Sequence, residues 1–315
     1  MIARSVQTVL EPVLKLLRHG DLEQARQGLQ NILQEDLENP TVLYTLKGVK
    51  FWEDRLQQIS DIADSFSQGE YIIAQWAPFL TYMKKEGIFS EPIIYALKCY
   101  AFTSALRFYG KLLTEDTRKQ PAEIYRKTGL CYKALGDYDT ARECLNFALS
   151  KEQDSPPVLA ELADAYALAG EIRWAKLYFR EAFFKGASKI ELPFLESGLI
   201  NSLIARVASF GYSGKELAEW LPIYGKLDGV LTVKRELRAL EIGRLKQSIY
   251  SLESELKSGN ATEEEKLLKP RLINYYFWLI DHYINISEDK RKIDEILLRI
   301  KLIDTSIYNR YVGIA

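Results

Sequence analysis

The sequence is poor in the residues that usually carry catalytic, covalent or metal chemistry. It has three cysteines, Cys99, Cys131 and Cys144, and two histidines, His19 and His282. An odd, widely spaced set of cysteines favours a reducing cytoplasm over a disulfide scaffold. Because the chain has no Cys-x-x-Cys pair beside a histidine, we expect no zinc site and interpret the cysteines as small buried apolar residues.

The chain also lacks an excess of either charge, and it lacks long apolar runs. Lysine and arginine total 42 against 43 aspartate and glutamate, which argues against a nucleic-acid partner. The longest conspicuous uncharged run, Tyr71–Met83, has 13 residues and contains Pro78, so it falls short of the roughly 20 that a membrane span requires. Glu11 and Pro12 interrupt the first apolar residues, and we expect no secretory signal. With 47% hydrophobic and 27% charged residues, the sequence is typical of a folded protein.

Two short motifs resemble catalytic or phosphate-binding patterns without having their spacing. Gly211-Tyr212-Ser213-Gly214 misses the Gly-x-Ser-x-Gly spacing of a hydrolase nucleophile, and Gly214-Lys215 lacks the upstream glycine of a phosphate-binding loop. We interpret Ser213 as the N-cap of a helix. Asp281 and His282 are adjacent on an expected helix and so point about 100 degrees apart, which argues against a catalytic pair. The sequence therefore predicts no catalytic residue, nucleotide site, metal or other cofactor.

The most informative feature of the sequence is an internal repeat. Shifting residues 122–155 by 34 positions superposes them on residues 156–189. The matching landmarks are Tyr132 with Tyr166, Leu135 with Ala169, Gly136 with Gly170, Asp137 with Glu171, Ala141 with Ala175, and Ala148 with Ala182. A repeat of this length is typical of a helix–turn–helix unit.

Each repeat has the pattern of two antiparallel helices joined by a tight turn. Apolar residues recur at helical spacing before Gly136, and glycine ends a helix in the left-handed conformation at little cost. A second periodic run starts at Tyr138, and the small residues Gly129, Ala141 and Ala148 allow the two helices to approach closely. One hairpin cannot bury its apolar faces alone, so neighbouring hairpins are expected to stack.

These residues resemble the tetratricopeptide repeat (TPR) family. The family pattern appears in the first repeat as Tyr125, Thr128-Gly129, Tyr132, Gly136-Asp137-Tyr138, Ala141, Leu145 and Ala148, and in the second as Leu159, Leu162-Ala163, Tyr166, Gly170, Ala175, Phe179 and Ala182. Thr128 and Ala163 depart from the usual leucine and glycine, and the terminal proline comes late, at Pro156-Pro157. The resemblance implies an all-α fold, a right-handed superhelix of stacked repeats and a role in binding other proteins.

Weaker copies of the pattern lie in the N-terminal region. One copy has the turn Gly20-Asp21 followed by Ala25, and a second, from Pro40 to Gln68, is degenerate because Glu53-Asp54 stands where its turn glycine is expected. Residues 71–85 and 93–113 are also predicted to be helical, although the repeat register is lost there. We therefore predict a TPR-like repeat domain over residues 1–187.

Residues 188–315 are predicted to form a second, all-helical domain. Prolines and glycines divide it into short helices up to about residue 229. Leu231–Ser258 is interpreted as one long helix, and a capped start follows at Thr262, with Glu265 three residues later. This order predicts a long helical hairpin, with the aromatic run Tyr275–Trp278 in its core. A last helix is expected from residue 287 or 288 to residue 303.

A heptad-like seam runs along the expected long helix, formed by Ile242, Leu245, Ile249, Leu252 and Leu256. The seam covers about two heptads, fewer than a coiled-coil dimer usually needs. Packing within the chain is the favoured interpretation, and a homodimer through residues 242–256 is the alternative.

In the TPR family the first helix of each repeat lines a concave groove that binds peptides or helices of partner proteins. The resemblance places eight residues on that surface: Glu123, Arg126, Leu130, Lys133, Ala160, Asp164, Ala167 and Leu168. Leu130 and Asp164 stand where members that bind chaperone C-termini have asparagine, and Arg126 alone fits that chemistry. An apolar or helical peptide ligand is therefore preferred.

Three functions follow from this sequence. The first is a non-enzymatic adaptor or scaffold in the cytoplasm that binds other proteins through the groove. The second is a self-assembling subunit of a larger envelope, secretion or motility complex, with the seam as its contact. The third is an enzyme with a site in residues 190–229 or near Asp281 and His282, which a cleft of converging ionisable residues would support.

Overall fold

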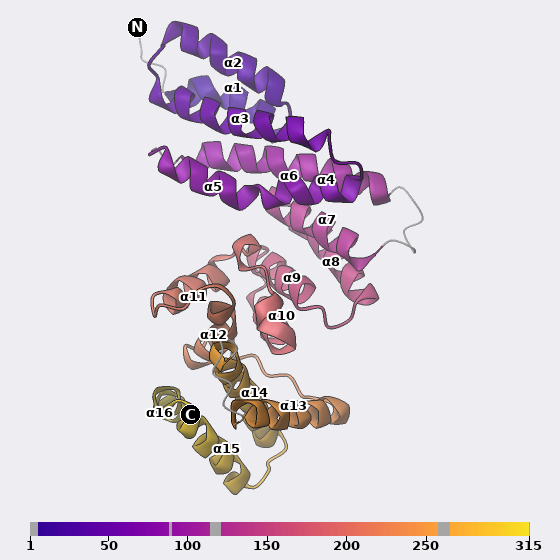
Figure 1. Ribbon diagram of the computed structural model, residues 1–315, viewed down its shortest axis with the longest axis vertical. Coiled ribbons are helices and arrows are strands. Elements are labelled where there is room, and N and C mark those ends of the chain that lie inside the picture. Colours follow the sequence, from indigo (N-terminus) through magenta and orange to yellow (C-terminus); the bar gives the residue numbers. More distant parts are fainter. Residues whose placement is uncertain (1–5, 88–89, 114–120, 258–264, 315) are drawn as a thin grey trace. The chain divides into compact units, whose positions relative to one another are not determined.

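The structure is a computed structural model that describes residues 6–87, 90–113, 121–257 and 265–314, and within these ranges all regular secondary structure is helical (Figure 1). The predicted all-α fold class is therefore confirmed. The chain forms two compact units, unit 1 (Met1–Lys151) and unit 2 (Glu152–Ala315). This division falls between the two clear repeats, and the predicted domain boundary after residue 187 stays a prediction.

Unit 1 is built around the long helix α6, which contacts α1, α4 and α7 (Figure 1). Its helices are α1 (Val6–Arg18), α2 (Leu22–Glu35), α3 (Pro40–Ile59), α4 (Ser65–Ala74), α5 (Trp76–Lys85), α6 (Glu91–Leu113), α7 (Ala122–Leu135) and α8 (Tyr138–Lys151). Ala96, Leu97 and Ala105 of α6 have no exposed surface, so this helix forms the centre of the core.

Unit 2 is built around α12 and α14, which pack on each other; α10 packs on α12, and α13 packs on α14. Its helices are α9 (Pro156–Leu168), α10 (Ile172–Gly186), the short 3-10 turns η1 (Ala187–Lys189) and η2 (Leu192–Phe194), α11 (Gly198–Ala208), α12 (Gly214–Leu227), α13 (Ala239–Lys257), α14 (Glu265–Asn285), α15 (Lys290–Ile303) and α16 (Thr305–Ile314). The expected run of short helices up to residue 229 is present.

Three helical hairpins, α1/α2, α7/α8 and α9/α10, turn in the same way. Gly20, Gly136 and Gly170 follow their first helices with φ angles of 83, 88 and 83 degrees. The backbone N–H of the next residue donates to a carbonyl five positions back in each turn: Asp21 to Leu16 at 3.0 Å, Asp137 to Tyr132 at 3.0 Å and Glu171 to Tyr166 at 2.8 Å. This Schellman geometry satisfies carbonyls that the helix end leaves unpaired. The predicted helix–turn–helix units are confirmed at these three places.

Small residues keep the two helices of each hairpin close together. Ala25, Ala141 and Ala175 lie in the first turn of the second helices and have no exposed surface. In the α7/α8 hairpin a Cβ on Gly129 would stand 2.7 Å from Cγ of Leu145, so only glycine fits there without a shift. Larger side chains at these positions would push the helices apart.

The degenerate second copy does not turn where the sequence predicts. Helix α3 continues through Glu53 and Asp54 to Ile59, which is buried. Glu and Asp do not break a helix, and Glu53 pairs with Arg26 of α2 at 3.1 Å, so the helix gains a contact by continuing. The turn comes instead before α4, where the Asp64 carboxylate accepts the N–H of Ser67 at 2.8 Å.

The expected helix over residues 71–85 is divided in two. Helix α4 ends at Ala74, and α5 begins at Trp76 after a break at Gln75. Pro78 explains the break, because its ring would clash with the carbonyl four residues earlier in a continuous helix, whereas the first turn of a new helix accepts proline. Helix α6, by contrast, matches the expected helix at 93–113 within two residues.

The predicted helix over 231–258 begins eight residues late, at Ala239. Residues 231–238 are extended, with Leu231 and Leu237 buried and the carbonyl of Val233 accepting a hydrogen bond from Arg180 at 2.8 Å. These long-range contacts outweigh the local helix pattern. Glu241 lies in the first turn of α13, and its carboxylate accepts the Arg238 N–H at 2.9 Å and so caps that turn.

The seam on α13 is covered within unit 2. Ile242, Leu245, Ile249 and Leu252 are all buried, and α13 packs against α14, so the predicted long hairpin is confirmed. Leu256, the fifth residue of the seam, is half-buried, and the alternative of a homodimer through residues 242–256 stays a prediction. The predicted cap at Thr262 lies outside the described residues.

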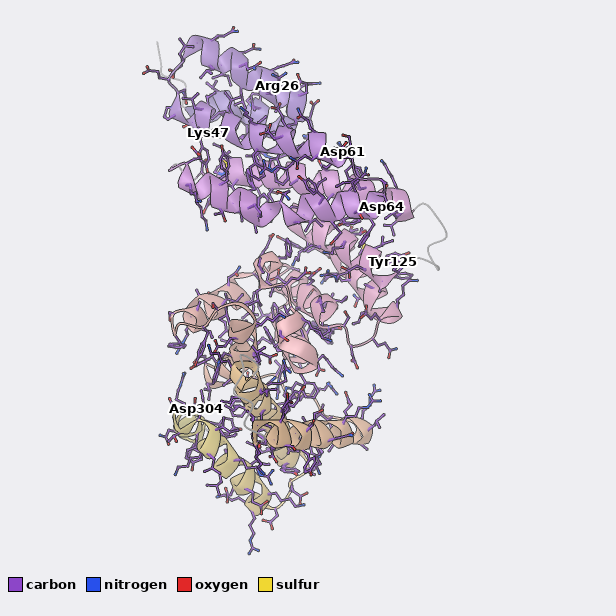
Figure 2. All side chains as sticks on the ribbon, viewed as in Figure 1. Arg26, Lys47, Asp61, Asp64, Tyr125 and Asp304 are labelled. Atoms are coloured by element: carbon purple, nitrogen blue, oxygen red, sulfur yellow. The ribbon has the colours of Figure 1, made fainter. Side chains whose placement is uncertain are left out.

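The end of the chain differs from expectation in its caps and in one extra helix. Ser287 does not begin the last predicted helix; it follows α14 in the left-handed region with a φ of 52 degrees. The N-cap of α15 is Asp289, which accepts the N–H of Arg291 at 3.0 Å. A further helix, α16, follows Asp304, whose carboxylate accepts the N–H of Ile307 at 2.9 Å (Figure 2).

Candidate functional site

The eight predicted groove residues lie on α7 and α9, and the structure does not expose them as a set. Five are buried: Arg126 (4% exposed), Leu130 (1%), Lys133 (1%), Ala160 (0%) and Asp164 (0%). The other three, Glu123, Ala167 and Leu168, are partly exposed. The exposure expected of a groove surface is therefore absent at five of the eight residues, and the binding role of the set stays a prediction. Helix α7 packs against α6 as well as α8, and α9 packs against α11 as well as α10, which covers more of each first helix than the repeat pattern predicts.

Asp164 has a structural role at the start of α11. Its carboxylate accepts the backbone N–H groups of Glu196 at 2.8 Å and Ser197 at 2.9 Å, just before α11 begins. Ser197 is the N-cap residue of α11, and its hydroxyl makes no capping bond. Asp164 of α9 thus holds the two residues that precede α11, whereas an N-cap side chain would accept N–H groups of the first helical turn. No sequence pattern links position 164 to position 197.

A buried polar network ties α7 to the helices before it in unit 1. Lys127 is 3% exposed, and its Nζ lies 2.9 Å from the Glu70 carboxylate of α4. The Tyr109 hydroxyl on α6 donates to the same carboxylate at 2.5 Å. Burial raises the pKa of Tyr109, and the neighbouring Glu70 raises it further. Gly69 lies beside this tyrosine, where a Cβ would stand 2.6 Å from the ring, so glycine permits the close contact.

The main charged cluster of unit 2 surrounds Asp281 on α14. This carboxylate is 3% exposed and pairs with Arg180 of α10. Lys226 of α12 lies 3.0 Å from both carboxylate oxygens, and Lys234 from the extended segment lies 3.4 Å from Oδ1. The cluster thus joins four separate parts of the unit.

Electrostatics inside this cluster favour the charged carboxylate. Burial alone would raise the pKa of Asp281, but Arg180, Lys226 and Lys234 outweigh burial and hold the pKa below its ordinary value. The pKa of Lys226 is lowered, mainly by burial and partly by the nearby Arg180, although the Asp281 carboxylate raises it. Asp281 is therefore a negative centre held by three cations, an arrangement typical of an ion-pair network.

Two arginines lie near the ring of Trp278, one turn before Asp281. The Arg180 guanidinium is 4.3 Å from its ring centroid, and that of Arg235 is 5.8 Å away. Arg235 also pairs with Glu181 at 2.5 Å and Glu241 at 2.9 Å. Hydrogen bonding by Arg235 lowers the pKa of Glu241 to about 2, against the effect of burial. These contacts fix the extended segment 231–238 against α10 and α14.

His282 lies beside Asp281 in sequence but faces different surroundings. Its Nδ1 is buried and has no hydrogen-bond partner, whereas Asp281 binds the three cations. Burial lowers the pKa of His282, and Lys246 lowers it further. The structure therefore does not bring Asp281 and His282 together as an acid–base pair.

The irregular region after residue 187 forms a hollow of about 540 Å³ in unit 2. Its wall is mainly apolar, with Ile190, Leu195 and Leu217 among the lining residues. Glu191 and Lys215 are the ionisable residues on that wall. Ser213, the predicted N-cap, does occupy the N-cap position of α12, although its side chain makes no capping bond.

Metal and membrane features can be judged over the described ranges. Among those residues no group of three or more His, Cys, Asp or Glu is placed to hold a metal ion. All three cysteines are free thiols; Cys99 and Cys131 are buried as expected, while Cys144 is half-buried. No helix described is both long and apolar enough to cross a membrane.

Comparison with known proteins gives little further information. No protein-family model matches the chain, and no curated protein matches it. Among solved structures it is similar to the C-terminal part of a TPR repeat-containing protein from Cytophaga hutchinsonii. That match has 14% sequence identity and a TM-score of 0.30, and it covers 97% of this chain and 99% of the other. The helical-repeat interpretation therefore depends on the hairpins of this chain itself.

Proposed function

We propose that this protein is a non-catalytic, cytoplasmic adaptor that binds other proteins through its helical hairpins. The observation that carries the proposal is the recurrence of one hairpin design at three places, with the same left-handed glycine turn and the same buried alanine. Repeated helical hairpins present extended surfaces on which a peptide or helix of a partner can lie. The TPR resemblance of residues 122–189 implies the same mode of action.

The ionisable residues of unit 2 also favour a structural role over a catalytic one. Asp281 is paired with three cations, and Glu219, which is 2% exposed, is paired with Arg271 at 2.5 Å. Catalytic acids and bases need room for a substrate beside them. The hollow near residues 190–218 has a mainly apolar wall, which suits an apolar side chain of a partner better than acid–base chemistry.

The partly exposed members of the predicted groove are the residues to test. Ala167 and Leu168 lie in the last turn of α9, and both are partly exposed. Arg126 and Lys133 are unsuitable, because reversing a charge that is 4% or 1% exposed would disturb folding. A variant with Ala167→Glu and Leu168→Glu changes the surface instead.

The experiment is quantitative affinity purification from the native organism at equal expression. The wild type is compared with the Ala167→Glu/Leu168→Glu variant and with Leu37→Glu, a control at a position that is 73% exposed on unit 1. We expect a small set of proteins to be recovered with the wild type and the control and to be lost with the double variant. Recovery of the same set with the double variant would remove these residues from the binding surface, and recovery of no specific protein with the wild type would contradict the adaptor function.

A further inference from the structure

A second hollow, of about 700 Å³, lies between α3 and α5 in unit 1. None of the eight predicted groove residues lines it, because those residues are on α7 and α9. Phe51 and Tyr82 supply its aromatic wall, and Lys50, Arg55 and Lys85 supply positive charge. The region belongs to the part of the chain where the repeat register is lost, so the repeat pattern does not account for this surface.

The aromatic wall is held in place by its neighbours. The Phe51 and Tyr82 rings are stacked, with centroids 5.5 Å apart and an interplanar angle of 28 degrees. The Arg55 guanidinium lies 3.4 Å from the Phe51 centroid, and its Nη1 donates to the Phe51 carbonyl at 3.2 Å. Phe51 is 7% exposed and Tyr82 is half-buried, so Tyr82 is the more accessible of the two aromatic residues. A fixed wall of this kind loses little conformational entropy when a ligand binds.

The charge of the hollow is strongly unbalanced. Lys50, Arg55 and Lys85 line it together with a single carboxylate, that of Asp54. Lys50 and Lys85 are exposed and can reorient toward a ligand. The chain as a whole has a net charge of -1, so this excess of cations is local. Such a surface attracts acidic partners and repels basic ones.

We propose that the α3–α5 hollow binds an acidic segment of a partner protein, with a flat apolar side chain of that segment placed against Tyr82. The inference rests on the proposed adaptor function, since it names the chemistry of one partner. Carboxylates of the segment pair with Lys50 and Lys85, and a phenylalanine or proline ring covers the aromatic wall. The ring contributes contact area, and the charges contribute selection against basic segments.

The test uses the full-length protein and fluorescein-labelled decapeptides in an anisotropy titration. The probe peptide has eight glutamates around a central Phe-Pro; one comparison peptide has lysine for glutamate, and another has Gly-Gly for Phe-Pro. We expect the probe to bind at least about tenfold more tightly than the lysine peptide, with an affinity that falls as salt is raised. Equal binding of the two peptides, or displacement of the probe by inorganic phosphate, would overturn the proposal.

Variants then locate the site. Lys50→Glu with Lys85→Glu should weaken probe binding by about tenfold or more, whereas Lys15→Glu with Lys290→Glu, an equal change of charge at exposed lysines elsewhere, should change it less than about twofold. Tyr82→Leu should weaken binding of the probe but not of the Gly-Gly peptide, and thermal melting checks that each variant folds. Equal effects of the two lysine pairs would refute the site. If the peptide titrations fail while partner recovery still depends on Ala167 and Leu168, the hollow is excluded and the adaptor function stands.

Discussion

Replacing Asp281 with asparagine tests whether the charged cluster is the structural centre of unit 2. Asparagine has nearly the same shape, and its amide oxygen can still accept a hydrogen bond, but it carries no negative charge. The substitution therefore leaves Arg180, Lys226 and Lys234 close together without their shared carboxylate. Packing changes little, so the loss of stability reports on charge.

The size of the expected loss in the free energy of unfolding follows from how deeply each cation is buried. The side chains of Arg180 and Lys226 are 6% and 13% exposed, so water can do little to replace the carboxylate, whereas Lys234 is 41% exposed and contributes less. Removing one partner of a buried ion pair costs about 3–5 kcal/mol, and we expect Asp281→Asn to lower the free energy of unfolding by about that amount. Adding Lys226→Met should restore part of the loss, because it removes one of the stranded cations.

The assay is denaturant unfolding followed by circular dichroism, with hydrogen exchange to locate the change. Faster exchange is expected in peptides from α10, α12 and α14 and unchanged exchange in α1 and α2. Asp139→Asn, at a side chain that is 84% exposed, is the control and should stay within about 0.5 kcal/mol of the wild type. The charged cluster would not be the structural centre of unit 2 if Asp281→Asn lowered the free energy of unfolding by less than about 1 kcal/mol. The same would follow if the effects of Asp281→Asn and Lys226→Met on that free energy were strictly additive in the double variant.

Lowering the pH should remove the stability that the Asp281 carboxylate contributes. The pKa of Asp281 is lowered in the folded state, so its stabilisation is complete above the ordinary carboxyl value near pH 4 and is lost as the pH falls through the folded value. The difference in stability between the wild type and Asp281→Asn should therefore shrink below about pH 4. A difference that stays constant into strong acid would show that the carboxylate charge is not its source.

Four further outcomes can be checked by urea unfolding. Ala141→Leu and Ala175→Leu should each cost about 1–3 kcal/mol through overpacking, and unchanged stability would contradict the hairpin contacts. Gly243→Ala should stabilise by about 0.5–1 kcal/mol, because a Cβ there meets nothing within 4 Å and the residue is helical. Gly129→Ala should instead destabilise, since its Cβ would stand 2.7 Å from a leucine carbon; a gain from this substitution would show that the hairpin is looser than described. The pKa of His282 is lowered in the folded state, so the unfolded state binds the proton more readily and stability should fall as the pH drops below about 6.5. His282→Gln should flatten that slope, and an unchanged slope would contradict the assignment.

The parts of the fold that local sequence determines were predictable. A glycine followed by an acidic residue gives the same turn at Gly20, Gly136 and Gly170, because each turn needs a left-handed residue at one position. Asp21 and Asp137 also cap the helices that follow, whereas Glu171 makes no side-chain capping bond. The long helix α6 and the α13/α14 hairpin were found for the same reason, since their apolar periodicity extends over many residues.

The errors occur where a distant side chain decides the local structure. The segment 231–238 has a helical pattern, yet it is extended because Arg180 holds the Val233 carbonyl and Arg235 pairs with Glu181. Both contacts join positions more than 50 residues apart. Helix propensities amount to a few tenths of a kcal/mol per residue, so one buried charge-assisted hydrogen bond can reverse them over a short segment.

The same reasoning explains why the candidate groove was only partly predictable. A repeat pattern tells which face of a first helix turns away from its own second helix, but not what other helices lie against that face. Asp164 shows the difference: its position in the repeat predicts a ligand-facing residue, whereas its carboxylate accepts the N–H groups of residues 196 and 197 at 2.8 and 2.9 Å. A polar residue on the outer face of a repeat helix can therefore serve the next element of the chain, and a binding role for it requires that both of its oxygens remain available. Ala167 and Leu168 are partly exposed on α9, and Tyr82 lines the separate hollow, so these are the surfaces where binding should be sought.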